Sequence, residues 1–196
     1  MKGFVRSFTV MKKPLLCIAL ALAAPALACP VRALFSFTTP MSAYSPTILR
    51  RHYEQAAASK EAGEKFYDLL HNYRDQDALV LGYKAASEAI KARDASMLNK
   101  LTYVQQAART FDQAVALAPD NAEIRFLRFS VESNLPPFLG LSKHVEEDKS
   151  FLLGAALRHP NSGLDDEAFR TVRGFLVGRG HVSEADAQRL AQVKGS

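Results

Sequence analysis

The charged side chains best placed to do chemistry lie on either side of a proline pair. Arg125, Arg128 and Glu132 follow one another at i, i+3 and i+7, so they share one face of a predicted helix. The acidic run Glu146-Glu147-Asp148 comes after Pro136-Pro137, where a turn allows a second helix to fold back beside the first. We therefore expect these six charged residues, called here the charged cluster, to lie close together.

Two interpretations fit the charged cluster. It can form a recess that binds a peptide carboxylate or a basic partner, which makes its six residues a candidate binding site. It can instead form a salt-bridge network that fixes the corner between two antiparallel helices. We favour the network, because charged side chains in folded proteins are normally solvated or paired.

Other chemistry finds little support in the sequence. The chain contains no Gly-x-Ser-x-Gly, no His-Glu-x-x-His and no glycine-rich phosphate loop. His144 with Glu147 or Asp148 supplies at most two metal ligands from one helix, whereas a zinc site needs three or four. We predict no metal, no cofactor and no catalytic residue. A cell-envelope enzyme of unknown reaction, with its site around Arg125, Arg128 and Glu132, remains the alternative.

The elements that must position these side chains are helices. Apolar residues recur every three or four positions along most of the chain, and Ser, Asp or Asn stands where each periodic stretch begins. Ser142 is expected to cap the helix of the acidic run, and Gly63 to interrupt the first helical stretch. The expected helical segments are 46–73, a second that begins at Asp75 or Asp77 and ends near 93, and then 101–117, 122–134, 142–159, 165–178 and 183–193. No run of alternating residues predicts a strand, so we predict an all-α domain of antiparallel helical hairpins over residues 46–196.

Residues 1–28 are predicted to be a signal peptide. Lys12-Lys13 precede an apolar run of 13 residues from Leu15 to Leu27, which is shorter than the about 20 residues that cross a bilayer. Met11 offers a second start directly before this pattern, and a buried N-terminal helix is the alternative. Residues 29–45 contain prolines among Ser and Thr, which is typical of an extended tether.

Cys29 is a candidate for lipidation. Ala26-Leu27-Ala28-Cys29 resembles a bacterial lipobox with Ala and Leu interchanged, and Ala26 and Ala28 equally suit ordinary signal peptidase. We place simple secretion slightly ahead of lipid anchoring. Both routes predict export to the periplasm or the outer-membrane surface. Cys17 leaves with the leader, so the mature chain keeps at most one cysteine and forms no internal disulfide.

Composition narrows the range of partners. The chain has 196 residues, 48% of them apolar, and a formal charge of +5. Lys2, Arg6, Lys12 and Lys13 lie in the leader, so the mature chain keeps a net charge of only +1. This balance excludes disorder and removes the main reason to expect nucleic-acid binding. The leader and the lipid anchor are the only expected membrane attachments.

One part of the chain resembles a tetratricopeptide repeat. Ala107, Phe111, Ala114 and Pro119 have the small, aromatic, small and proline order of the second helix of such a unit, and Leu81-Gly82 is similar to the pair in the first helix. Gly82 and Ala107 lie 25 residues apart, a wider spacing than in the family. Residues 77–119 are therefore similar to one repeat with a lengthened hairpin.

A second resemblance extends over residues 77–153. Asn134-Leu135-Pro136-Pro137-Phe138-Leu139-Gly140 and Glu146-Glu147-Asp148-Lys149 resemble segments of small exported proteins of bacteroidete-type bacteria that have no assigned function. The two resemblances imply an exported helical binding or scaffold module. Its expected partner is a peptide or another envelope protein held between hairpins. A purely structural lipoprotein is a further alternative.

Overall fold

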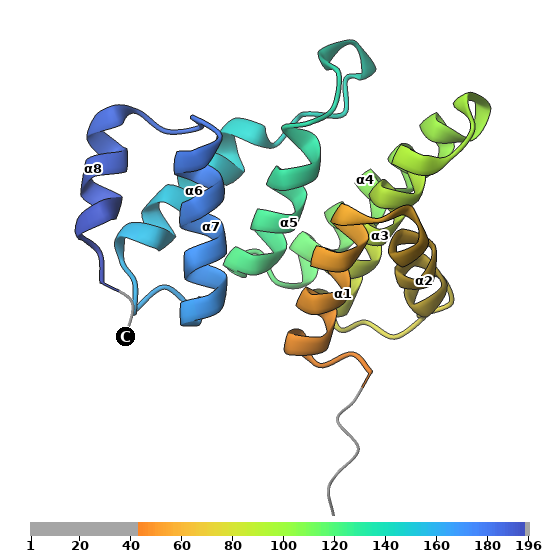
Figure 1. The fold of residues 1–196 in the computed structure, drawn as a ribbon, viewed down its shortest axis with the longest axis horizontal. Helices are drawn as coiled ribbons and strands as arrows, with labels where there is room; N and C mark the ends of the chain where they lie inside the picture. The colour runs from red at the N-terminus through yellow and green to blue at the C-terminus, as the bar shows by residue number, and fades with distance from the viewer. Residues whose placement is uncertain (1–42, 195–196) are drawn as a thin grey trace, which may run out of the picture. The chain divides into compact units, whose positions relative to one another are not determined.

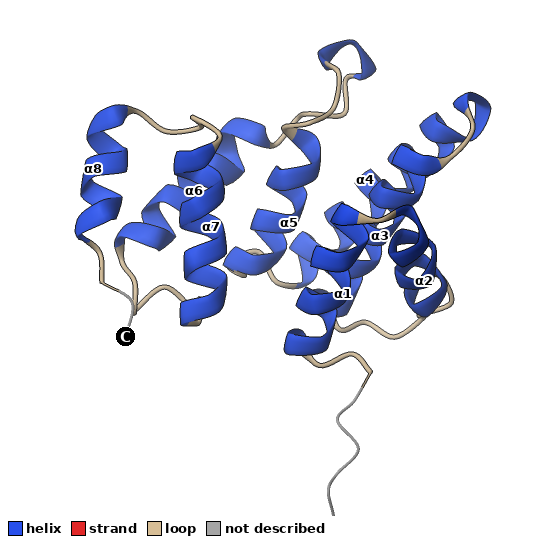
Figure 2. Cartoon of the chain, viewed as in Figure 1, coloured by secondary structure: helices blue, strands red, loops and turns tan. Residues whose placement is uncertain are grey.

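The computed structural model describes residues 43–194, and all of the regular structure in this range is helical (Figures 1 and 2). The prediction of an all-α fold is confirmed there. The predicted signal peptide, Cys29 and most of the tether lie outside the described residues. The elements are α1 Pro46–Ala58, α2 Lys60–Leu70, α3 Ala78–Asp94, α4 Met97–Leu117, α5 Ala122–Glu132, the 3-10 turn η1 Pro137–Leu139, α6 Val145–Leu157, α7 Asp166–Gly178 and α8 Glu184–Gln192.

The first helical stretch breaks at Ser59, so the prediction of a break at Gly63 is wrong. Ser59 has extended backbone angles, and its hydroxyl accepts a hydrogen bond from the Ala62 amide at 3.4 Å, which starts α2. Gly63 lies buried inside α2, where a Cβ atom would come within 2.9 Å of Ile90 Cγ2. This glycine therefore permits the close approach of α2 to α3.

The other helix starts follow the predictions with three exceptions: Ser45 precedes α1 without a side-chain cap hydrogen bond, α4 begins at Met97 rather than at 101, and Ser142 does not cap α6. Four side chains accept hydrogen bonds from the first turn of the helix that follows them: Asp77, Asn121, Asp165 and Ser183. The prediction that Ser142 caps α6 is wrong, because α6 begins at Val145 with His144 as its N-cap. The Ser142 hydroxyl instead donates to the Glu132 carbonyl at 2.9 Å.

Helix α5 lies between two hydrophobic clusters. Ile124 and Leu127 on one face belong to the cluster built by α1 to α4, and Phe126 and Phe129 belong to the cluster built by α6 to α8. Figure 1 shows α5 with α1 and α3 on one side and α6 and α7 on the other. Both hydrophobic clusters therefore include side chains of this one short helix.

Helices α3 and α4 form a long hairpin joined by Ala95 and Ser96. Both helices bury small residues, among them Ala85 on α3 and Ala107 and Ala114 on α4. This hairpin spans the segment that resembles a tetratricopeptide unit, and membership of that family stays a prediction. Its α4 stripe is buried at Ala107, Phe111, Ala114 and Val115, whereas Leu101 remains 46% exposed.

The hairpin also holds a buried carboxyl group. Glu88 of α3 is fully buried and accepts hydrogen bonds from the Thr110 hydroxyl and from Gln106 Nε2, both at 2.8 Å. Burial raises the pKa of Glu88, and the two donors partly oppose that rise. Ionised Glu88 therefore costs the folded chain free energy.

We predict that Glu88→Gln stabilises the protein relative to wild type, by a free energy of unfolding that grows as the pH rises. The wild type loses stability as the pH increases through the raised pKa of Glu88, while a glutamine has no proton to lose. The Gln106 amide can rotate to accept from the new amide. Thermal unfolding between pH 5 and pH 8 should show an advantage of the variant over wild type that grows with pH. The exposed Glu54→Gln is the matched control, and equal pH profiles for Glu88→Gln and wild type would contradict the prediction.

Candidate functional site

The charged cluster is centred on an ion pair between α5 and α6. Arg128 donates from Nε to Asp148 Oδ2 at 2.7 Å and from Nη2 to Oδ1 at 2.8 Å. Asp148 is fully buried and Arg128 is 3% exposed. Such a forked pair fixes both the distance and the rotation of one helix against the other.

Arg125 adds a second cation to the same carboxylate. Its Nη1 donates to Asp148 Oδ1 at 2.9 Å and also to the Glu147 carboxylate, whose pKa it lowers. Its Nε donates to the Pro119 carbonyl at 2.8 Å, and its guanidinium lies 4.8 Å from the centre of the Phe151 ring. Arg125 is therefore held on several sides by the protein itself.

Glu132 binds the start of the acidic helix rather than the two arginines. Its carboxylate accepts from the His144 amide at 2.8 Å and pairs with His144 Nδ1 at 2.9 Å. Glu146 turns away, because it is 80% exposed and pairs with Lys149 one turn later at 2.5 Å. The structure thus brings together four of the six predicted residues, Arg125, Arg128, Glu147 and Asp148, whereas Glu132 pairs with His144 and Glu146 with Lys149.

This geometry corresponds to a salt-bridge network. The buried guanidinium and carboxylate groups donate to and accept from one another, and the pockets described below are lined by other residues. A buried arginine paired in this way has little remaining capacity to bind a ligand. The binding role of these residues stays a prediction that the contacts do not favour.

A second polar network joins α1 to α5 and α7. Arg50 donates to both oxygens of Glu123 at 2.8 and 2.6 Å and to Asp165 Oδ2 at 2.7 Å. The Tyr83 hydroxyl donates to Glu123 Oε1 at 2.5 Å, and the hydrogen bond to Glu123 raises the pKa of Arg50. Sequence reasoning missed these residues because Arg50 and Glu123 lie 73 positions apart, and no motif joins them.

A cavity of about 60 Å³ lies beside this network, lined by Arg50, Tyr53 and Tyr83 among others. A bound water needs roughly 10–15 Å³ of such volume. The cavity can therefore hold a few water molecules and is too small for an organic substrate.

A larger pocket of about 630 Å³ opens between the tip of the α3–α4 hairpin and the segment around η1. Its size is in the range of small-molecule and peptide side-chain sites, about 300–1,000 Å³. We call it the apolar pocket. Its lining residues are Tyr53, Ala89, Ile90, Ala92, Arg93, Met97, Lys100, Leu101, Val104, Ser130, Val131, Asn134, Leu135, Pro136, Phe138 and Leu139.

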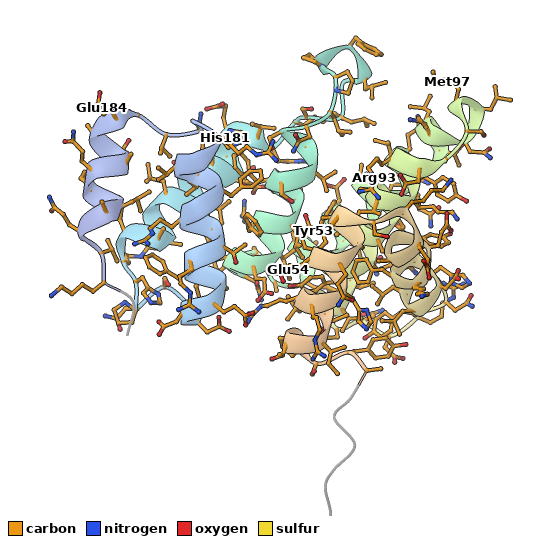
Figure 3. The ribbon with its side chains drawn as sticks, viewed as in Figure 1. Tyr53, Glu54, Arg93, Met97, His181 and Glu184 are labelled. Carbon is orange, nitrogen blue, oxygen red and sulfur yellow. The ribbon has the colours of Figure 1, made fainter. Side chains whose placement is uncertain are left out.

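The apolar pocket has hydrophobic side chains at its mouth. Met97 is 82% exposed and Phe138 is 86% exposed, although both are large and apolar. Figure 3 shows Met97 at the outer tip of the hairpin and Tyr53 on α1, and Arg93, in the last turn of α3, donates to the Ala56 and Ala57 carbonyls of α1. A facing pair of exposed apolar walls is typical of a surface that a partner covers.

The polar groups of the apolar pocket are few. The Tyr53 hydroxyl lies 3.1 Å from Ser130 Oγ, and Asn134 Nδ2 donates to the Ser130 carbonyl at 2.7 Å. Arg93 and Lys100 are the charged residues of the described lining, which contains no histidine, cysteine or carboxylate. Such a lining suits binding of an apolar group and offers no nucleophile with a base.

Two histidines outside the pocket have structural contacts. His159 Nε2 lies 2.9 Å from Asp166 Oδ1, its Nδ1 lies 3.3 Å from Ser162 Oγ, and its ring stacks on Phe169. These contacts hold the connection between α6 and α7 in place. The His159 side chain is only 1% exposed, so a substrate cannot reach it. His181 stacks on Phe175, and burial lowers its pKa.

Residues 43–194 contain neither a cluster of metal ligands nor a helix that could span a membrane. Within that range, no group of three or more His, Cys, Asp or Glu side chains could hold a metal ion. No helix of the same range is both long and apolar enough to span a bilayer.

Comparison with known proteins assigns no family to the chain. A scan against protein-family models finds no match, and searches of curated proteins and of solved structures likewise find none. The apolar pocket and the two polar networks are therefore the features of this chain that bear on its function.

We predict that Arg128→Ala lowers the free energy of unfolding by about 3 kcal/mol, because it leaves Asp148 buried with one of its two cations missing. Chemical denaturation measures the loss. The control is Arg170→Ala on the exposed face of α7, which should change stability by less than about 0.5 kcal/mol. Equal stability of the two variants would argue against a structural role for the cluster.

Proposed function

We propose that this chain is an exported helical binding module, which holds an apolar segment of a peptide or of another envelope protein in the apolar pocket. The observation that carries the proposal is the pocket itself, with about 630 Å³ of space between two walls of exposed hydrophobic side chains. The partner supplies apolar side chains, and the pocket removes them from water.

The energetics support a binding role. Fully burying one large apolar side chain stabilises a complex by about 1.5–3 kcal/mol. Met97, Leu101 and Phe138 all present accessible apolar surface at the pocket. A few such contacts are enough to offset the loss of motional freedom on association and to give a measurable affinity.

Catalysis by the charged cluster has weaker support. An enzyme there would need polar groups that reach a substrate, whereas Arg128 and Asp148 are buried against each other. The described lining of the apolar pocket also contains no carboxylate, histidine or cysteine. We therefore propose recognition without chemistry.

The proposed address rests on the leader. The lysine pair and the apolar run within residues 1–28 support export, and the Pro-containing segment 29–45 supports a tether that separates the export site from α1. Cys29 offers the proposed attachment to a membrane if it is acylated. A binding module on such a tether can reach partners at the envelope surface.

We predict that Phe138→Ser weakens binding of a fluorescein-labelled, uncharged leucine, alanine and glutamine peptide by about tenfold or more. The melting temperature should stay unchanged, because the Phe138 side chain is already 86% exposed in the free protein. Fluorescence anisotropy measures the affinity. The matched control is Val177→Ser, which removes a 41% exposed apolar side chain from α7, outside the pocket. Equal affinities for both variants would count against the proposed function.

We predict that mass spectrometry of the protein from its native envelope finds a mature chain without residues 1–28. An acylated Cys29 at the N-terminus would indicate a lipoprotein, and an unmodified N-terminus would indicate simple secretion. A Cys29→Ser variant separates the two routes, because it abolishes acylation and leaves ordinary cleavage intact. Recovery of a chain that retains Met1 or Met11 would contradict export.

A further inference from the structure

We propose that the occupant of the apolar pocket is an amphipathic helix of a partner protein, with acidic residues along the flank that faces Arg93 and Lys100. This inference rests on the proposed function and names the chemistry of its partner. Three features of the pocket carry it: the state of its backbone groups, the spacing of its apolar residues and the sign of its charges.

The backbone of the pocket walls favours a helical partner. The walls are parts of α1, α3, α4 and α5 together with η1, and beyond the first turn of each helix the backbone amides are already bonded internally. Tyr53, Ser130 and Asn134 bond to one another or to backbone, as described above. An extended peptide would bury unpaired amides and carbonyls here, whereas a helix satisfies its own backbone before it binds.

The spacing along α4 fits such a partner. Met97, Leu101 and Val104 lie at i, i+4 and i+7, so they form one stripe along the wall of the pocket. The opposite wall is apolar as well and consists of Leu135, Pro136, Phe138 and Leu139. A helix whose own apolar residues recur at i, i+3, i+4 and i+7 can insert that face between the two walls.

The charges at the pocket select an acidic flank. Arg93 donates two hydrogen bonds to the Asp94 carboxylate, at 2.9 and 2.6 Å, and lowers the pKa of that carboxyl group. The Asp94 carboxylate therefore balances much of the positive charge of Arg93. Lys100 donates to the Arg93 carbonyl at 3.1 Å, and Lys60 and Lys100 both lie near enough to Asp94 to lower its pKa further. Three cations around one carboxylate leave a positive rim, which attracts glutamates and repels lysines.

The test uses three fluorescein-labelled peptides of about 18 residues, long enough to populate a helix. Two share the same leucine and alanine face and carry either glutamates or lysines along the flank. The third is the glutamate peptide with two central residues replaced by proline, which breaks the helix. For the wild-type protein we expect the glutamate peptide to bind about fivefold tighter than the lysine peptide, and the proline peptide to lose binding. Added salt should reduce the preference between the first two.

Charge reversal at Lys100 separates this inference from the proposed function. Lys100→Glu should abolish or reverse the preference for the glutamate peptide, measured as the ratio of the affinities for the glutamate and lysine peptides in the same variant. Lys65→Glu, at a residue 71% exposed on α2 outside the pocket, is the matched control and should keep the preference.

Each outcome of these measurements has a defined meaning. Equal binding of the proline and unbroken peptides would overturn the helical partner. An unchanged charge preference in Lys100→Glu would overturn the acidic flank. In either case a continued effect of Phe138→Ser on the uncharged peptide would leave the proposed function standing, whereas loss of that effect would remove both.

Discussion

The structure depends on the burial of α5 between two hydrophobic clusters. Eight of its eleven residues are buried, among them Arg128, Ser130 and Glu132. A helix enclosed on nearly every side cannot leave polar groups without partners, since each unpaired group costs free energy. The positions of α1 and α6 are therefore coupled to the side chains of α5, because Tyr53 bonds Ser130 and Asp148 pairs with Arg128. Such buried pairs contribute more to a defined helix arrangement than to net stability.

The same constraint produces the apolar pocket. Glu132, at the end of α5, accepts from Ser142 through its carbonyl and from the His144 amide through its carboxylate. These bonds hold the two ends of the segment from 133 to 144 together, so the part around η1 projects as an arm (Figure 1). Gly140 has a φ of 62°, which allows the chain to turn back there. The α3–α4 hairpin extends beyond α5 on the other side, and the space between arm and hairpin is the pocket.

The sequence predicts those features that depend on local chemistry. Helix starts at Asp77, Asn121, Asp165 and Ser183 follow from side-chain capping, and the meeting of Arg128 with Asp148 follows from helical spacing across a proline turn. The break at Ser59 was missed because Gly63 is the stronger local signal, and its real role is a contact with α3 that only the tertiary structure creates. The Arg50 network and the pocket join residues far apart in the chain, and no periodic pattern encodes such contacts.

The distribution of polar groups explains why recognition is a better interpretation than catalysis. A catalytic site needs polar groups that are held in place and still reach a substrate. Here Arg128, Asp148 and Glu88 are held in place by burial, and that burial removes them from solvent. The surface around the pocket shows the opposite arrangement, because the exposed side chains there, Met97 and Phe138, are apolar and carry no group that could act in catalysis. The apolar pocket leaves hydrophobic area accessible to solvent beside Arg93 and Lys100. Covering such a surface with a partner lowers the free energy.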